Sequence, residues 1–249
     1  IFNVAIRTIQ LYQGKAIYGV GGGITWDSTW ESEYREVHQK AAVLYRKQAR
    51  FKLITTGKIS QKNLLFEEQH LERLRKASRY FAYPFDQEIL RQKIEAECQA
   101  CDDNQDYRLR ISLSKSGEIE LSSQILTPLS PSFCQAKLCL QEVNLQQAFT
   151  YFKTTHRPHL SLGEQEKIYH NEKGELLETS IGNLVLKIAG KLYTPPIRLG
   201  ILPGIYRQHL LETGQVEEKV LTLADLAQAE AIYGCNAVRG LYELSLEEN

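Results

Sequence analysis

Methionine is absent from this chain of 249 residues, which begins at Ile1. Without an initiator residue, we expect the sequence to be one piece of a longer polypeptide. It also lacks a run of about 20 apolar residues, the length of a membrane span, and a basic and apolar leader peptide. The sequence therefore predicts a cytoplasmic protein whose partners do not include a membrane.

The chain also has no net charge, because its 30 lysines and arginines balance its 30 aspartates and glutamates. A balanced chain has no overall field to attract nucleic acid, so we expect a small charged metabolite as its partner. The five cysteines are scattered, and their odd number does not indicate a disulfide framework. The single CxxC motif, from Cys98 to Cys101, lies at an expected helix end and indicates a structural role.

Alternating strand patterns and helical spacings follow one another along the chain and predict a mixed α/β (α+β) fold. Residues 1–24 have the pattern of a hairpin that leads into a glycine run. A helix is expected from Asp27, with Asp27 or Ser28 as its N-cap, and a second one before Pro84. The other expected elements are strands within 51–60 and 63–69, a helix over 86–100, a hairpin over 107–126, a strand over 136–143, hairpins over 166–179 and 182–196, a helix over 204–214, and one helix and one strand in 224–244.

Groups suited to pyridoxal phosphate chemistry lie in the second half of the chain. Such a site needs an amine that forms an imine, an acid beside the pyridine nitrogen and groups that bind phosphate. Lys153 lies among apolar and hydroxyl residues, which favour a lowered pKa, and Glu178 lies between two strand-like runs. The helix start at Gly204, Ile205 and Tyr206 offers backbone amides to an anion. Considered one at a time, these features also fit an ordinary interpretation. Lys153 fits a lysine at the surface, Glu178 a glutamate in a hairpin, and residues 204–206 a helix start that binds no ligand.

The motifs KTTHR, LLETSIGN, YTPPIRLGILPGIYR and NAVRG occur in this order, and residues 51–242 resemble the class IV aminotransferases. The chain is most similar to the lyase half of proteins in which aminodeoxychorismate synthase component I is fused to 4-amino-4-deoxychorismate lyase. This resemblance implies the two-domain fold of the D-amino acid and branched-chain aminotransferases, with pyridoxal 5'-phosphate between the domains, and a homodimer. It also implies release of 4-aminobenzoate and pyruvate in folate biosynthesis.

The same resemblance assigns roles to individual residues. Lys153 corresponds to the Schiff-base lysine and Glu178 to the partner of the pyridine nitrogen, and these two are the catalytic candidates. Arg157 and Arg239 are candidates for substrate carboxylates, because arginine binds a carboxylate bidentately. Where such lyases usually have F-x-L-x-E-T, this chain has FKLITT, so Thr55 replaces a glutamate and activity or specificity could differ. The implied cofactor-binding residues are Arg73, Lys153, Glu178, Ile205, Tyr206 and Asn236.

A second resemblance covers the N-terminal segment. FNVAIRT, GVGGGITWDS and ESEYREVHQKA resemble the C-terminal end of chorismate-utilising synthases, the other half of a bifunctional 4-aminobenzoate synthase. In that family an arginine and a glycine run bind chorismate and a glutamate binds magnesium, which corresponds here to Arg7, residues 21–23 and Glu36. Glu36 and Lys40 are equally an ordinary i,i+4 helix pair. Because only the last part of the synthase is present, we expect no synthase activity and no working metal site.

These observations predict three parts, with a break in composition near residues 45–50. Residues 1–45 are the synthase fragment, 46–145 the small α/β domain and 146–249 the larger cofactor-binding domain. Two alternatives to a lyase remain open. A branched-chain or D-amino acid aminotransferase has the same cofactor groups but does not release pyruvate without a keto-acid acceptor. A non-catalytic remnant that serves as an interaction module does not bind the cofactor.

Overall fold

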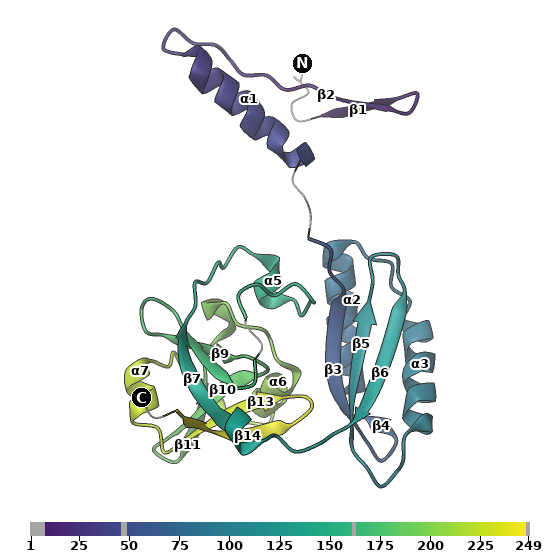
Figure 1. The fold of residues 1–249 in the computed structure, drawn as a ribbon, viewed down its shortest axis with the longest axis vertical. Helices are drawn as coiled ribbons and strands as arrows, with labels where there is room; N and C mark the ends of the chain where they lie inside the picture. Colours follow the sequence, from purple (N-terminus) through teal and green to yellow (C-terminus); the bar gives the residue numbers. More distant parts are fainter. Residues whose placement is uncertain (1–7, 46–48, 161–162, 248–249) are drawn as a thin grey trace. The chain divides into compact units, whose positions relative to one another are not determined.

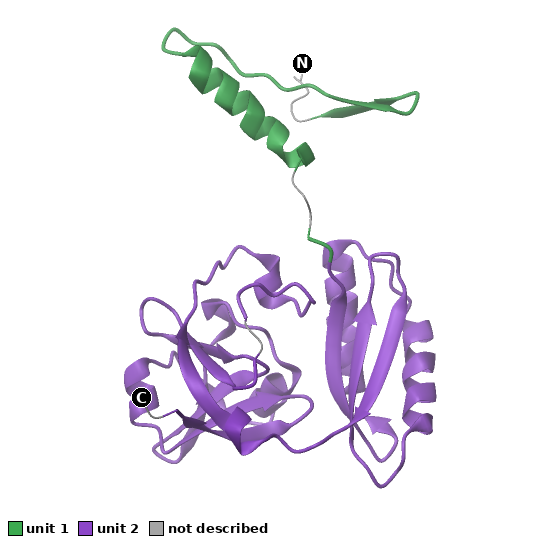
Figure 2. Ribbon diagram, in the orientation of Figure 1, with its two compact units in different colours: residues 1–50 green, residues 51–249 purple. Residues whose placement is uncertain are grey.

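The computed structural model describes residues 8–45, 49–160 and 163–247. The chain forms two compact units, residues 1–50 and 51–249, which Figure 2 shows in green and purple. Within the described ranges, no helix is long and apolar enough to cross a membrane.

Unit 1 consists of a hairpin and a helix. Strands β1 (Ile9–Tyr12) and β2 (Lys15–Tyr18) pair antiparallel, which confirms the predicted hairpin. The turn residues Gln13 and Gly14 both have positive φ, as a tight two-residue hairpin turn requires. Helix α1 (Trp30–Tyr45) begins later than predicted. Thr29, rather than Asp27 or Ser28, accepts a first-turn amide, that of Ser32, at 3.3 Å.

The first lobe of unit 2 is a four-stranded antiparallel sheet with two helices (Figure 1). Its strand order is β4-β3-β5-β6. Asp86 caps the second helix by accepting the amides of Glu88 and Ile89. The first helix ends at Phe81, and its C-cap, Ala82, lies in the left-handed region two residues before Pro84. The elements are β3 (Leu53–Ser60), β4 (Asn63–Leu64), α2 (Glu67–Phe81), α3 (Gln87–Ala100), β5 (Tyr107–Leu113) and β6 (Ile119–Ile125).

The two faces of this sheet differ because side chains alternate along a strand. Leu53, Leu109 and Ile111 belong to one buried core with residues of α2 and α3. Residues at the intervening positions, such as Thr56 and Arg110, are register partners and point to the opposite face. The sheet therefore presents a polar, basic face to the second lobe.

The second lobe is built on an eight-stranded sheet of order β12-β11-β10-β13-β14-β7-β8-β9. An additional pairing of β9 with β10, through Glu178 and Asn183, joins six of these strands into a ring. Helix α6 packs on β13. The elements are α4 (Pro131–Cys134), β7 (Gln135–Leu140), α5 (Ala148–Tyr151), β8 (Lys167–His170), β9 (Leu176–Thr179), β10 (Asn183–Ile188), β11 (Lys191–Thr194), η1 (Ile197–Leu199), α6 (Ile205–Glu212), β12 (Glu217–Glu218), α7 (Leu223–Ala227), β13 (Ala231–Asn236) and β14 (Gly240–Leu246).

The prediction of one helix and one strand for the tail was wrong, because two strands follow α7. The residues between them form a tight turn. The Asn236 Oδ1 atom accepts the amides of Val238 and Arg239, each at 2.9 Å, and Gly240 has a φ of 67°. This short turn joins β13 and β14 and holds Asn236 and Arg239 at one end of the sheet.

The predicted division at residues 145 and 146 stays a prediction. Strand β7, which precedes it, already pairs with β14 and β8 of the larger sheet. A division of unit 2 by sheets would therefore fall between β6 and β7.

Candidate active site

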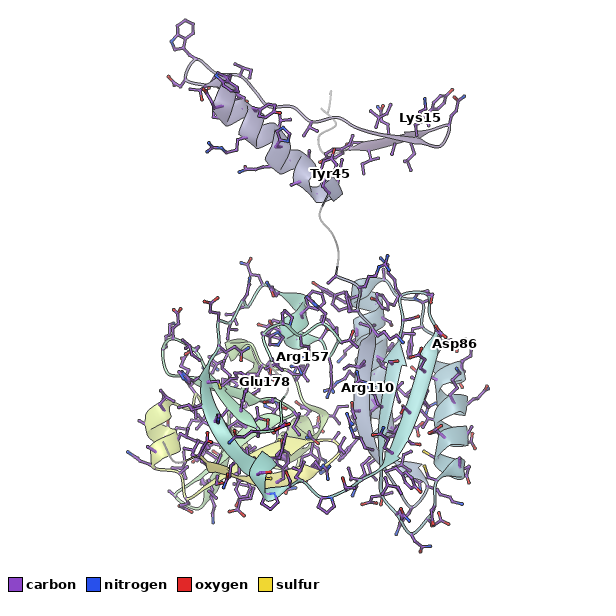
Figure 3. The ribbon with its side chains drawn as sticks, in the orientation of Figure 1. Lys15, Tyr45, Asp86, Arg110, Arg157 and Glu178 are labelled. Carbon is purple, nitrogen blue, oxygen red and sulfur yellow. The ribbon has the colours of Figure 1, made fainter. Side chains whose placement is uncertain are left out.

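A cavity of about 670 Å³ lies between the basic face of the four-stranded sheet and the ring of strands. A pocket of this size between two lobes can hold a cofactor and a small substrate. Figure 3 shows Arg157 and Glu178 on one side of this space and Arg110 on the sheet opposite. The charged residues that line the cavity are Arg73, Arg108, Arg110, Lys153, Arg157, Glu178 and Arg239.

Lys153 lies at the junction of the two lobes. Its backbone carbonyl accepts the amide of Ile54 at 3.0 Å, and the next residue, Thr154, bridges to Leu53. Burial, together with the nearby guanidinium groups of Arg73 and Arg157, lowers the pKa of Lys153 to about 7. The amine is thus available in its neutral, nucleophilic form near physiological pH.

Glu178 is a buried carboxylate on β9, 2 % exposed. Its Oε1 atom accepts from Arg157 Nη2 and its Oε2 atom from the Leu202 amide, both at 3.3 Å. Burial raises the pKa of Glu178, while Arg157, the Leu202 amide and Lys153 act in the opposite direction. Among the described lining residues it is the only acid, so a bound cation or protonated ring nitrogen would be attracted to it.

The anion-binding end is formed by the start of α6. Gly204 is its N-cap, without a side-chain cap from the described residues, so the first helical amides are free of intrahelical acceptors. Gly204 and Ile205 line the cavity. Tyr206 is not among the lining residues, and its ring packs near Phe66 and His209. Only its backbone amide remains a candidate contact.

Each of the predicted arginines already contacts another group of the protein, and these partners differ. Arg73 donates from Nη2 to the Pro203 carbonyl at 2.6 Å, and Arg239 donates to the Thr127 carbonyl. Arg157 contacts Glu178, so it is a partner of the acid as well as a candidate for substrate. Asn236 lines the cavity while its side chain holds the turn before β14.

Sequence reasoning missed Arg108 and Arg110, which line the cavity from β5 and are exposed to solvent. The sequence around these two arginines does contain a pattern that could have predicted them. In YRLRISL the basic residues alternate with Leu109 and Ile111, which predicts a charged strand face opposite the core face. What that charged face opposes depends on the second lobe, whose strands follow later in the chain.

Thr55 does not reach the cavity. Its neighbours Ile54 and Thr56 line it, whereas the Thr55 side chain is fully buried on the helix side and its Oγ1 atom lies 2.6 Å from His70 Nδ1. Position 55, where Thr55 replaces the expected glutamate, therefore belongs to the contact between β3 and α2 and is not part of the cavity wall.

Because His70 is buried, we predict that the free energy of unfolding falls in acid. Burial, with Arg73 and Lys153 nearby, lowers the pKa of His70 to about 3. Between the ordinary pKa of about 6.5 and this value, the unfolded chain binds a proton that the folded chain does not. Stability should therefore fall as pH drops through that range, by up to about 1.4 kcal/mol per pH unit from this residue. Urea unfolding of His70→Gln from pH 6.5 to 4 should show a shallower slope than wild type. The exposed His38→Gln serves as control, and an equal slope in His70→Gln would contradict the assignment.

The predicted chorismate and magnesium residues lie in unit 1. Arg7 is outside the described residues. Lys40 donates to the Gly21 carbonyl at 2.8 Å and forms an ion pair with Glu36. In the described part of the chain no cluster of three or more His, Cys, Asp or Glu side chains could hold a metal ion.

Comparison with known proteins agrees with this architecture. Residues 52–245 match the amino-transferase class IV family, and the chain belongs to it. Residues 1–46 match the chorismate binding enzyme family. The predicted family, fold and cofactor are thereby confirmed, because class IV aminotransferases are pyridoxal phosphate enzymes.

Several relatives cover most of unit 2. A solved structure from Mesorhizobium loti, a "Putative amino-acid aminotransferase", is 27% identical with a TM-score of 0.70, covering 79% of this chain and 100% of that one. A "Putative 4-amino-4-deoxychorismate lyase" from Legionella pneumophila is 20% identical with a TM-score of 0.64, covering 79% and 83%. The latter likeness shows the fold alone.

Similarity in sequence also extends to curated proteins, including two that match part of this chain. An uncharacterized protein of Haemophilus influenzae is 33% identical over 79 residues, which are 32% of this chain and 41% of that protein. The match thus spans less than half of that relative. The "Putative aminodeoxychorismate lyase" of Schizosaccharomyces pombe is 24% identical over 60% of this chain and 68% of its own length.

The described residues fit pyridoxal phosphate. The cavity holds a lysine of lowered pKa, a buried carboxylate and an uncapped helix start with an arginine nearby. These are the amine, the acid and the anion-binding groups that such a cofactor requires. The individual assignments remain predictions, which the variants described below test.

Proposed function

We propose that residues 51–249 are a pyridoxal phosphate-dependent 4-amino-4-deoxychorismate lyase that releases 4-aminobenzoate and pyruvate. The observation that carries this proposal is the charge of the cavity. Five arginines and Lys153 face a single lining acid, Glu178. The cofactor phosphate would neutralise part of this excess, and aminodeoxychorismate brings two further carboxylates. Arginine pairs with carboxylates through strong, charge-assisted hydrogen bonds.

Three of these arginines are suited to the substrate. Arg108 and Arg110 come from the small lobe and Arg239 from the large lobe, so they approach the cavity from opposite sides. A branched-chain amino acid has one carboxylate and an apolar side chain, which would leave most of these cations unpaired. The cavity charge therefore fits a substrate with two carboxylates, such as aminodeoxychorismate, better than a branched-chain amino acid.

The chemistry requires removal of one proton and loss of one leaving group. The bound cofactor supplies an electron sink for the carbon that carries the amino group. Lys153 Nζ takes the proton from that carbon, the bond between the neighbouring ring carbon and the enolpyruvyl oxygen breaks, and the enolpyruvate that leaves takes up a proton to become pyruvate. With the cofactor bound, Glu178 would hold its ring nitrogen protonated, and the arginines would orient the two substrate carboxylates.

The match of residues 1–46 to chorismate binding enzymes supports a place in a bifunctional 4-aminobenzoate synthase. We infer that the lyase then acts in folate biosynthesis on the product of the attached synthase. We also propose a cytoplasmic location, as the sequence predicts, and a homodimer, as the family resemblance implies.

Pyruvate release without any keto acid tests the proposal. The purified protein with pyridoxal phosphate and aminodeoxychorismate should form pyruvate and 4-aminobenzoate in equal amounts. Arg110→Gln should raise KM about tenfold or more, because a hydrogen bond to a charged group contributes about 1.5–3 kcal/mol. Arg198→Gln, at an exposed residue outside the cavity, is the control. Turnover of branched-chain amino acids with 2-oxoglutarate, and none of aminodeoxychorismate, would establish the aminotransferase alternative instead.

A further inference from the structure

The segment from Leu202 to Gly204 is held on several sides. The Leu202 amide donates to Glu178 Oε2 at 3.3 Å, and the Leu202 carbonyl accepts from Asn183 Nδ2 at 2.8 Å. The Pro203 carbonyl accepts from Arg73 at 2.6 Å. This segment, which we call the clasp (residues 202–204), therefore connects the acid on β9 with the first turn of α6.

Asn183 is placed to set the clasp. It is 3 % exposed, lines the cavity and is the cross-strand partner of Glu178. A Cβ atom on Gly204 would lie only 1.9 Å from Asn183 Oδ1. Gly204 has a φ of −68°, which any residue adopts. Glycine is required at 204 by the Asn183 side chain and not by the backbone conformation.

We propose that Asn183 is a positioning residue that fixes the distance between the Glu178 carboxylate and the start of α6. In the site proposed above, on which this inference rests, the Glu178 carboxylate would hold the ring nitrogen of pyridoxal phosphate and the first amides of α6 would hold its phosphate. The Asn183 amide nitrogen holds the Leu202 carbonyl, and its amide oxygen lies against Gly204. Loss of either contact lets the clasp move, so the acid and the helix amides no longer match the length of one cofactor molecule.

The affinity for pyridoxal phosphate reports on the position of the clasp and can be measured without turnover. Asn183→Ala should weaken pyridoxal phosphate binding about tenfold, since it leaves the buried Leu202 carbonyl without its donor. The phosphorus NMR signal of the bound cofactor should shift as well. Thr194→Val removes an equally buried hydrogen bond on β11, to the Leu184 carbonyl at 2.7 Å, outside the cavity. It should lower Tm and leave affinity and the phosphorus signal unchanged.

A double-mutant cycle gives the decisive test. Gly204→Ala should weaken binding about tenfold in wild type, because the new methyl group displaces Asn183. In the Asn183→Ala background it should add little, since the nearest other side chain, Arg207 Cβ, would lie 3.4 Å away. Equal losses in both backgrounds, or wild-type affinity of Asn183→Ala, would overturn the inference. Absence of lyase turnover alone would contradict the proposed reaction and leave the affinity cycle readable.

Discussion

Lys153→Ala is expected to abolish turnover, with a fall in kcat of about 10⁴-fold or more, because one side chain serves as both nucleophile and proton carrier. Its lowered pKa of about 7 makes the neutral amine available where an ordinary lysine is almost fully protonated. The wild-type protein with pyridoxal phosphate should show a visible absorption band. Borohydride reduction and peptide mapping should then place the cofactor on Lys153.

The same variant separates chemistry from folding. In the wild type without cofactor, burial and two nearby arginines disfavour the charged form of Lys153. Removal of the amine relieves that cost, so the Tm of cofactor-free Lys153→Ala should be no lower than that of wild type. Lys187→Ala, at a lysine paired with Glu230 outside the cavity, is the control and should keep the band. Label on another lysine in wild type would refute the assignment.

Glu178→Gln is expected to lower kcat about 10²- to 10³-fold while KM changes little. The amide keeps the shape of the side chain but removes the one negative charge among the described lining residues. A ring nitrogen that is no longer held protonated withdraws electrons less effectively from the reacting carbon. Steady-state kinetics with absorption spectra between pH 6 and 9 measure both consequences.

A second variant, at a buried glutamate outside the cavity, serves as the control for Glu178→Gln. Glu166 is also a buried glutamate, and its Oε2 atom accepts from Tyr242 at 3.0 Å, but it does not line the cavity. Glu166→Gln should reduce stability and leave kcat per folded molecule close to wild type. Similar kcat losses in both variants would indicate general damage, and a normal kcat in Glu178→Gln would exclude its role at the ring nitrogen.

Local patterns were sufficient for most elements and for the family. The hairpin of residues 9–18, both helices of the small lobe and the β5–β6 hairpin follow from alternation, caps and turn residues. The prediction of a single strand in the tail was wrong because β13 and β14 are separated by a turn after Asn236. This turn depends on the Asn236 side chain folding back on two amides, a contact that hydrophobic periodicity does not encode.

For the site too, some features follow from the sequence and others only from the tertiary structure. The sequence by itself determined the chemical types and the order of the groups: an amine at Lys153, an acid at Glu178, and a glycine before a helix. Only the tertiary structure decided which of them meet. Strand alternation fixes that Arg110 and Thr55 point to opposite faces, but the packing of the second lobe made one face a cavity wall. Contacts such as Asn183 with residues 202–204 join separate elements, and their geometry depends on the folded ring of strands.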